Sequence, residues 1–276
     1  LAAMVEALRG EHEVSVVAHR VVHGGERFTE ATLITDDVLA QLDALSPLAP
    51  LHNPVNIAGI REMQRLLPSV PHVAVFDTAF HHTLPSYAYL YGLPYEFYEK
   101  QGVRRYGFHG MSHSYVGLRA AQFLERRPNE LEIVSCHLGN GSSLCAVDHG
   151  RSVDTTMGFT PVEGLIMGTR CGDVDAGVIT FLERTSGLTV PQIDELINKK
   201  SGLLGLSGIS SDMREILTAA KAGESRALIA LKTYCYRIRK YIGAYVAAMG
   251  GLDAVVFTGG VGQGSDMVRA LALQGG

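Results

Sequence analysis

The sequence has few cysteines, little excess charge and no long apolar run, and each of these absences excludes a class of protein. None of its four cysteines forms a CxxC pair, which argues against a disulfide framework or a zinc module and favours a reducing, cytoplasmic location. No apolar run approaches the roughly 20 residues that a membrane-spanning helix needs. The formal net charge of −4 argues against a protein whose main task is to coat nucleic acid or an anionic membrane. We therefore expect no membrane partner and no nucleic-acid partner.

The composition is that of a globular chain with many glycines. Hydrophobic residues make up 46% and charged residues 19%, which is typical of a chain that folds around a core. A chain of 276 residues can form one large domain or two ordinary ones. Many of the 31 glycines follow predicted strands, at 24–25, 139–141 and 259–264, where backbone can approach a ligand closely. We expect main-chain N–H groups there to bind a polyanion.

Helical and strand patterns alternate along the chain, which favours an α/β fold. The predicted strands cover residues 14–22, 70–76, 133–138, 142–147, 151–155 and 254–257. The predicted helices cover residues 36–45, 53–67, 112–125, 177–185, 191–199, 212–222 and 224–249. No internal repeat, low-complexity tract or Ser/Gly linker interrupts this alternation.

Two glycine-rich turns are candidates for binding phosphate or a nucleotide base. The first is Gly139-Asn140-Gly141, an Asn-Gly hairpin signal between two predicted strands. It lacks the Gly-Lys-Ser/Thr and the following helix of a P-loop. The second is Thr258–Gly262, where a flat base could lie over backbone with small side chains. Each turn alone fits an ordinary tight turn better than a ligand site.

Two arginines lie where a charged side chain needs an anion. Arg20 lies inside an apolar strand, and Arg170 is flanked by small residues. A guanidinium in such surroundings is costly unless it is paired. The partner is either a ligand carboxylate or phosphate, or a structural carboxylate from Glu26, Asp173 or Asp175. The residues alone leave both interpretations open for each arginine.

Asp77 and the histidines offer further candidates. Asp77 follows a predicted strand, where a carboxylate can hold Mg²⁺, position a nucleophile or cap a turn. Among the 11 histidines, His19/His23 and His109/His113 share the His-x-x-x-His spacing. Neither leading histidine is followed by the glutamate of a metalloprotease. A single imidazole that donates to a developing anion is favoured over a zinc site.

Taken together, these segments resemble the acetate kinase family, which includes acetate and propionate kinases. The matching segments come in family order and span nearly the whole chain, which makes the series far more specific than one glycine loop. They are His19–Gly25, Pro47–Pro54, Phe76–His81, Arg104–Gly110, His137–Ser143, Met157–Pro161, Met167–Asp173, Ile209–Arg214 and Phe257–Gly262. After the last segment the family usually has Glu-Asn where this sequence has Gln263-Gly264, which removes one charge near the nucleotide.

The resemblance implies a two-lobed α/β fold of the actin-like ATPase (ribonuclease H-like) type. Mixed sheets are flanked by helices in this fold, and ATP lies in the cleft between the lobes. Residues 1–79 are then part of the first lobe, on the acyl-substrate side, and residues 80–276 are the second, nucleotide-binding lobe. The family's opening Asn-x-Gly-Ser-Ser-Ser turn and its C-terminal metal-associated glutamate have no match here. We therefore expect an incomplete first lobe and a missing C-terminal end.

The resemblance also implies an activity: reversible transfer of a phosphoryl group from ATP to acetate, giving acetyl phosphate and ADP, with Mg²⁺ or Mn²⁺. It further implies a cytoplasmic homodimer. Three alternatives remain open: a propionate kinase, a truncated and non-catalytic nucleotide-binding relative, and a sugar kinase of the same superfold. A sugar kinase would need polar, hydroxyl-reading residues where the acyl pocket of this sequence is apolar.

The matched motifs imply roles for single residues. Arg20 and Arg170 flank the carboxylate and the transferred phosphoryl group, and Asp77 is the catalytic carboxylate. His109 stabilises the transition state, and His52 supports it. The acyl pocket consists of Arg20, Val22, Leu51, Phe108 and Pro161. The ATP site consists of His137, Leu138, Gly139, Asn140, Gly141, Asp212, Met213, Arg214, Gly260, Val261, Gly262, Gln263 and Gly264. The resemblance assigns no certain metal ligand, because the family's metal-binding segments lie outside this chain.

Overall fold

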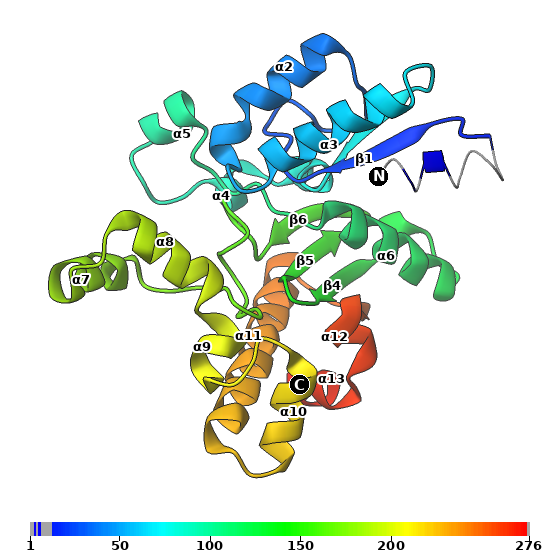
Figure 1. Cartoon of the computed structure of the whole chain (residues 1–276). Coiled ribbons are helices and arrows are strands. Elements are labelled where there is room, and N and C mark those ends of the chain that lie inside the picture. The colour runs from blue at the N-terminus through cyan, green and yellow to red at the C-terminus, as the bar shows by residue number, and fades with distance from the viewer. Residues whose placement is uncertain (1–2, 4, 7–12, 275–276) are drawn as a thin grey trace. The chain divides into compact units, whose positions relative to one another are not determined.

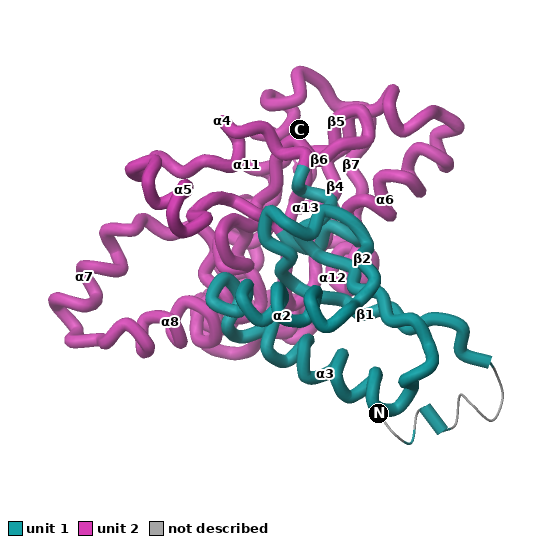
Figure 2. Tube along the Cα trace, turned by 90° about the horizontal axis from the view of Figure 1, so that it is seen from above, with its two compact units in different colours: residues 1–82, 108–111 teal, residues 83–107, 112–276 magenta. Residues whose placement is uncertain are grey.

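The structure is a computed structural model that describes residues 3, 5–6 and 13–274 of the chain (Figure 1). The outer bounds of the two expected lobes, residues 1 and 276, lie outside the described residues. Contacts within the chain divide it into two compact units, drawn in teal and magenta in Figure 2. Unit 1 comprises residues 1–82 and 108–111, and unit 2 comprises residues 83–107 and 112–276. The short segment 108–111 thus groups with unit 1, although it comes after the first residues of unit 2.

Unit 1 contains a small mixed sheet in the strand order β1-β3-β2. Its elements are β1 (Val17–Val21), β2 (Thr32–Leu33), α2 (Asp36–Ala44), the 3₁₀ helix η1 (Ser46–Leu48), α3 (Asn53–Leu66), β3 (His72–Phe76) and the 3₁₀ helix η2 (Ala79–Thr83). β1 is parallel to β3, and β2 is antiparallel to it. Because β1 and β3 are parallel, their C-terminal ends meet at the same edge of the sheet.

Local sequence explains the two helices of unit 1. The Thr35 hydroxyl accepts a hydrogen bond from the Val38 N–H and so caps the start of α2. α3 begins at Asn53 with Pro54 in its first turn, as the sequence predicts. The apolar sides of both helices pack on the sheet, in a buried core of Val21, Phe28, Ile34, Val38, Leu39, Leu42, Ile57, Ile60, Ala74 and Phe76.

Unit 2 is built on a four-stranded mixed sheet in the order β6-β5-β4-β7. The strands are β4 (Glu132–Leu138), β5 (Ser142–Asp148), β6 (Arg151–Thr155) and β7 (Ala254–Thr258). The first three form an antiparallel meander, and β7 is parallel to β4. The hairpin predicted by the Asn140-Gly141 pair is confirmed, because Leu138 and Ser142 are paired on either side of it.

The other elements of unit 2 are helices. They are α4 (Ser86–Tyr89), α5 (Glu96–Gln101), α6 (Gly110–Phe123), the 3₁₀ helix η3 (Pro128–Glu130), α7 (Ala176–Ser186), α8 (Val190–Lys199), α9 (Gly202–Ser207), α10 (Met213–Lys221), α11 (Ser225–Met249), α12 (Gly259–Gly264) and α13 (Asp266–Leu273). The first two residues of α6 group with unit 1. In the described part of the chain, no helix is both long enough and apolar enough to span a membrane.

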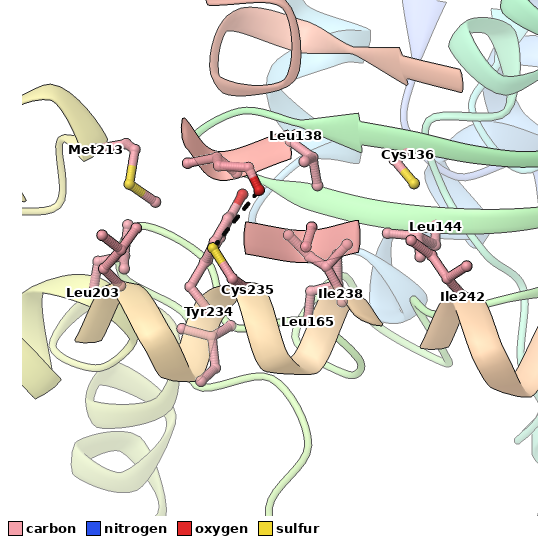
Figure 3. Close-up of a cluster of buried hydrophobic side chains, with 14 of the residues drawn as sticks. Cys136, Leu138, Leu144, Leu165, Leu203, Met213, Tyr234, Cys235, Ile238 and Ile242 are labelled. Atoms are coloured by element: carbon pink, nitrogen blue, oxygen red, sulfur yellow. Dashed lines mark hydrogen bonds between the residues drawn. The ribbon is translucent and has the colours of Figure 1, made fainter. Parts of the chain in front are cut away.

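The main core of unit 2 lies between α11 and the sheet. Figure 3 shows Tyr234, Ile238 and Ile242 of α11 on the side of the helix that faces Cys136 of β4 and Leu144 of β5. All five side chains are buried. Close packing at this face holds β4 and β5 in place. It therefore also fixes the position of the hairpin that joins these two strands.

The α/β class predicted from the sequence is confirmed, because both sheets are mixed and helices flank them. The described elements that the sequence did not predict are short: β2, α4, α5, α9, α12, α13 and the 3₁₀ helices η1, η2 and η3. α12 forms where the sequence predicts a turn, although glycine is a poor helix former. Gly259 has a φ of 78°, and a Cβ atom there would lie 2.5 Å from the Leu138 carbonyl oxygen. Glycine is therefore required where α12 approaches β4.

Candidate active site

The C-terminal ends of β1 and β3 bring Arg20 and Asp77 together in unit 1. Val21 lies opposite Phe76 in the sheet, and the Asp77 N–H donates to the Val21 carbonyl at 3.0 Å. Arg20 Nε donates to Asp77 Oδ1 at 2.9 Å, and Nη2 donates to Oδ2 at 2.6 Å. The hydrogen bonds to Asp77 raise the pKa of Arg20. The structural carboxylate beside Arg20 is therefore Asp77 and not Glu26.

The two partners differ in exposure. The Asp77 side chain is 2% exposed, whereas the Arg20 side chain is 58% exposed. The two hydrogen bonds to Asp77 use only part of the five N–H donors of the guanidinium. Arg20 is thus oriented by a buried carboxylate and keeps an exposed side on which it can bind a ligand anion. Both interpretations of Arg20, the structural ion pair and the anion site, are compatible with this geometry.

The segment 108–111 approaches Asp77 within unit 1. The Gly110 N–H donates to the Asp77 carbonyl at 2.8 Å, and His81 Nε2 donates to the Phe108 carbonyl at 2.9 Å. His109, between these two anchors, has a φ of 58°, which side-chain-bearing residues rarely adopt. Backbone strain of this kind is often found at functional sites. The structure places the backbone of the predicted catalytic histidine beside the predicted catalytic carboxylate.

The end of β1 is tied to the start of α3. Asn53 Nδ2 donates to the His23 carbonyl at 3.0 Å, and the His23 N–H donates to Asn53 Oδ1 at 3.2 Å. Val22 immediately precedes His23, and Leu51 and His52 immediately precede Asn53. This reciprocal pair holds two predicted site segments together along their backbones.

The predicted acyl pocket draws on both units. Phe108 is 2% exposed, and its ring packs edge-on against His23 with 5.6 Å between the centroids. Leu51 is 54% exposed. Val22, Leu51 and Phe108 belong to unit 1, and Pro161 belongs to unit 2. Each unit therefore carries part of the apolar surface that the resemblance assigns to the acyl group.

Unit 2 contains a cavity of about 450 Å³, a size typical of small-molecule sites. The predicted ATP-site residues that line it are Gly139, Asn140, Asp212, Met213, Arg214, Gly260, Val261 and Gly264. The lining residues that sequence reasoning missed are Leu203, Ser211, Leu217 and Ser265. The structure therefore brings three separate predicted segments to one cavity.

The remaining predicted ATP-site residues do not line the cavity; they are His137, Leu138, Gly141, Gly262 and Gln263. Leu138 and Gly262 are buried, and a Cβ atom at Gly262 would lie 3.6 Å from the Leu138 Cβ. His137 Nδ1 and the Ser112 hydroxyl form a hydrogen bond of 2.8 Å. Leu138 and Gly262 therefore bring β4 and α12 close together, and His137 binds β4 to α6.

The cavity combines apolar side chains with a charged pair. Leu203, Met213 and Leu217 supply apolar surface. Asp212 accepts the Arg214 N–H at 2.8 Å, which caps α10, and Arg214 Nη2 donates to Asp212 Oδ2 at 2.5 Å. These hydrogen bonds lower the pKa of Asp212 to about 2, so the carboxylate is ionised at neutral pH. The arrangement suits a nucleotide, with apolar surface for a base and hairpin backbone for phosphates.

The turn that carries Arg170 contacts the Asn140 hairpin of unit 2. The Gly168 N–H donates to the Asn140 carbonyl at 3.0 Å. A Cβ atom at Gly168 would lie 2.1 Å from Asn140 Oδ1, so a side chain there would displace the Asn140 amide. Arg170 therefore lies two residues after Gly168, which binds Asn140 of the cavity lining within unit 2.

Arg170 has no acidic partner among the described residues. Its Nη1 lies 3.9 Å from Met167 Sδ, and burial lowers the pKa of the guanidinium. Both acidic residues that the sequence offers as structural partners, Asp173 and Asp175, bind other groups of unit 2. An unpaired, partly buried cation is costly for the fold. Of the two interpretations of Arg170, a ligand anion is therefore favoured over a structural ion pair.

The metal implied by the resemblance can be tested against the oxygen ligands present. Among the described residues, no group of three or more His, Cys, Asp or Glu side chains could hold a metal ion. In phosphoryl-transfer sites, Mg²⁺ is usually held by one or two carboxylates, by the phosphates and by water. Asp77 is a buried carboxylate at a strand end that can supply such a ligand. Asp77 is therefore one residue of unit 1 whose chemistry fits such a metal.

Comparisons with known proteins agree with this geometry. The sequence profile of the Acetokinase family matches residues 2–275. The acetate kinase of Halothermothrix orenii is 57% identical over 262 residues, which are 95% of this chain and 66% of the relative. The acetate kinase of Thermoanaerobacter pseudethanolicus is 57% identical over 268 residues, which are 97% of this chain and 67% of the relative. The chain thus spans about two thirds of the length of these curated relatives.

Solved structures match as well. The crystal structure of Porphyromonas gingivalis acetate kinase matches with a TM-score of 0.94 and 48% identity, and covers 100% of this chain and 72% of that one. A propionate kinase from Francisella tularensis subsp. tularensis matches with a TM-score of 0.94 and 42% identity, over 98% of this chain and 70% of that one. These matches confirm the expected actin-like ATPase fold. From the profile, the relatives and the structures together, the chain belongs to the Acetokinase family.

Proposed function

We propose that the protein to which this chain belongs is an acetate kinase. It transfers the γ-phosphoryl group of ATP to acetate, reversibly, and forms acetyl phosphate and ADP. Relatives 57% identical to the chain carry that name, which supports the proposal. The observation that carries it is Arg170, a partly buried cation with no acidic partner among the described residues, beside the hairpin that lines the cavity. A ligand phosphate or carboxylate would supply the negative counter-charge that Arg170 lacks.

The two expected lobes, residues 1–79 and 80–276, divide the substrates in this proposal. Residues 80–276 bind the nucleotide, with its base against Leu203, Met213 and Leu217 and its phosphates at the Asn140 hairpin. Residues 1–79 bind the acyl substrate, together with the apolar groups of 108 and 161. Asp212, Arg214, Gly260 and Gly264 also line the nucleotide site.

The chemistry needs charge compensation more than it needs a base. The carboxylate of acetate is already ionised near neutral pH, so no strong base has to activate it. The difficulty is that an anion must approach a polyanion. Arg20, Arg170 and His109 offset this repulsion and stabilise the charge of the in-line transition state, and His52 supports them. Asp77 orients Arg20 through the two hydrogen bonds described above.

We also infer a metal, an assembly and a location. Asp77 would hold Mg²⁺ or Mn²⁺ together with the nucleotide phosphates, and the ion would neutralise part of their charge. The protein is inferred to act as a cytoplasmic homodimer. Its four cysteines are free, which fits a reducing compartment. Analytical ultracentrifugation of the natural polypeptide tests the dimer.

The first experiment is an acyl-phosphate assay with hydroxylamine, on the natural polypeptide of measured intact mass. We expect acetyl hydroxamate when ATP, Mg²⁺ and acetate are all present, and none when any one is left out. Folded protein that forms no hydroxamate would exclude the kinase and favour a nucleotide-binding relative without catalysis.

Propionate kinase is the second candidate, because a Francisella propionate kinase matches with a TM-score of 0.94. The substrates differ by one methylene, which changes transition-state binding by only about 1–3 kcal/mol. The ratio of kcat/KM for acetate to that for propionate decides between the two names. A ratio above one supports the acetate kinase.

The nucleotide cavity yields a prediction about Gly260. This residue lines the cavity, and a Cβ atom there would meet no atom within 4 Å. Gly260→Val should therefore fold normally and place its methyl groups in open space at the nucleotide site. We expect the KM for ATP to rise at least about tenfold, or about 1.4 kcal/mol of binding, with the KM for acetate nearly unchanged.

Gly243→Val is the matched control for this prediction. Gly243 is an exposed glycine of α11 with the same free space, and it does not line the cavity. Its steady-state kinetics should equal those of the wild type. Equal KM values for ATP in the two variants would show that the cavity does not bind the nucleotide.

A further inference from the structure

The chain between β6 and α7, residues 156–175, carries both Pro161 and Arg170. All of these residues are described, and none belongs to a helix or strand. Connections of this length inside a compact domain are usually functional or disordered. This one is instead held by side chains that the proposed reaction does not use.

We propose that Glu163 and Asp173 are positioning residues for the reaction. Each carboxylate accepts a hydrogen bond from a tyrosine hydroxyl elsewhere in unit 2. Glu163 fixes the part of the loop that carries Pro161, and Asp173 fixes the part that carries Arg170. The inference rests on the proposed function, because that function gives Pro161 and Arg170 their roles.

Tyr91 and Glu163 hold the chain on both sides of Pro161. The Tyr91 hydroxyl donates to Glu163 Oε2 and accepts the Phe159 N–H at 2.8 Å. Phe159 comes two residues before Pro161, and Glu163 comes two residues after it. One hydroxyl therefore ties together both ends of the five-residue turn with the proline at its centre.

Arg105 completes this anchor. Its Nη2 donates to Glu163 Oε1 at 2.5 Å, and its Nη1 donates to the carbonyls of residues 155–157 at 2.9, 3.2 and 3.1 Å. The Arg105 side chain is only 16% exposed. A Cβ atom at Gly158 would lie 1.6 Å from Glu163 Oε2, so only glycine fits beside the carboxylate. Arg105 thus connects residues 155–157, at the start of the loop, to the Glu163 carboxylate.

Asp173 closes the second half of the loop. Its Oδ1 accepts the Gly164 N–H at 2.9 Å, and its own N–H donates to the Gly164 carbonyl at 2.9 Å. Its Oδ2 accepts the Tyr241 hydroxyl of α11 at 2.6 Å, and Arg237 Nη1 lies 3.7 Å away. Arg170 lies three residues before Asp173, inside the segment that these bonds close. The segment that contains Arg170 is therefore bound to α11 through Asp173 and Tyr241.

The two tyrosines act as neutral donors. Burial raises the pKa of Tyr91 and of Tyr241 above the ordinary value, so both keep their proton at neutral pH. Replacing either with phenylalanine removes one oxygen and keeps the ring. Each substitution therefore removes one hydrogen bond from one carboxylate of the loop, and it leaves the bonds of the other carboxylate unchanged.

The test compares Tyr91→Phe and Tyr241→Phe in the natural polypeptide. Tyr91→Phe should raise the KM for acetate at least about threefold and lower the preference for acetate over propionate, because Pro161 lines the acyl pocket. Tyr241→Phe should lower kcat at least about tenfold with little change in either KM, because misplacement of Arg170 affects the transition state most. Amide hydrogen exchange should rise mainly in residues 157–163 for the first variant and in residues 164–173 for the second.

Tyr106→Phe is the matched control. Its hydroxyl donates to the Gly102 carbonyl at 2.9 Å, outside the loop, and we expect wild-type kinetics and loop exchange. The inference is overturned if the two test variants behave like this control, or if both lower kcat and raise both KM values equally. Wild-type protein without kinase activity would overturn the proposed function instead. The exchange pattern would then still decide whether the carboxylates hold the loop.

Discussion

Arg170→Ala is expected to lower kcat for acetyl phosphate formation by about a thousandfold or more, as removal of an arginine finger does in other phosphoryl-transfer enzymes. Arg170 is the partly buried cation that has no acidic partner among the described residues, and its turn contacts the Asn140 hairpin through Gly168. Stability should change little. Burial lowers the folded-state pKa of Arg170 below its ordinary value, so the charged form weakens the fold at neutral pH. Its removal therefore takes away a group that the fold does not need.

The measurement is kcat by the hydroxamate assay, together with thermal unfolding of the same samples. Arg184→Ala is the control, because Arg184 is exposed on α7 and its loss should leave kcat unchanged. Arg170→Lys should stay close to the alanine variant, since an ammonium keeps the charge but not the planar fork. More than about a tenth of wild-type kcat in Arg170→Ala would be incompatible with a role at the transferred phosphoryl group.

The glycine-rich segments are the parts of the cavity lining that the sequence indicates most directly. The hairpin at Gly139–Gly141 depends on a two-residue turn, and its strands are neighbours in the sequence. After β7 the sequence predicts a turn and the structure has the short helix α12, but the need for glycine is met at Gly259, where the backbone approaches β4 and takes a positive φ. In both places the residues that determine the geometry are adjacent to the residues that form the site.

Pairings between distant segments are harder to predict. Arg20 and Asp77 are 57 residues apart, and they meet only because β1 and β3 are parallel with two helices between them. The residue pattern offered Glu26, a near neighbour in sequence, as the partner of Arg20. No local signal distinguishes Asp77 from it, because parallel pairing depends on the tertiary fold.

The apolar part of the cavity shows a second limit. Leu203 and Leu217 lie on α9 and α10, where apolar residues at helical spacing are usually core. Only the packed structure shows that these two side chains border open space.

The helices α4 and α5 were not predicted from the sequence, because helices of four and six residues are too short to show a 3.6-residue period. Tyr91 and Arg105, which bind Glu163 near Pro161, lie beside these two short helices.

Gly110→Ala is expected to lower kcat/KM at least about a hundredfold, because small displacements of catalytic groups have effects of that size. A Cβ atom at Gly110 would lie 2.3 Å from the Asp77 carbonyl oxygen and 3.0 Å from the Phe80 Cβ. The Asp77 backbone cannot retreat, since its N–H is bound to Val21 at the end of β1. The segment that carries His109 has to move instead. This overpacking should also destabilise the protein by about 1–3 kcal/mol.

Gly59→Ala separates this effect from the general effect of replacing a helical glycine. Gly59 lies in α3 of the same unit, and a Cβ atom there would meet no atom within 4 Å. Its replacement should keep activity and stabilise the helix by about 0.5–1 kcal/mol. The two variants add the same methyl group, so a difference in kcat/KM measures the contact between Gly110 and Asp77 alone. If both variants were equally active, the close approach of segment 108–111 to Asp77 would not be needed for catalysis, and His109 would lose its assigned role.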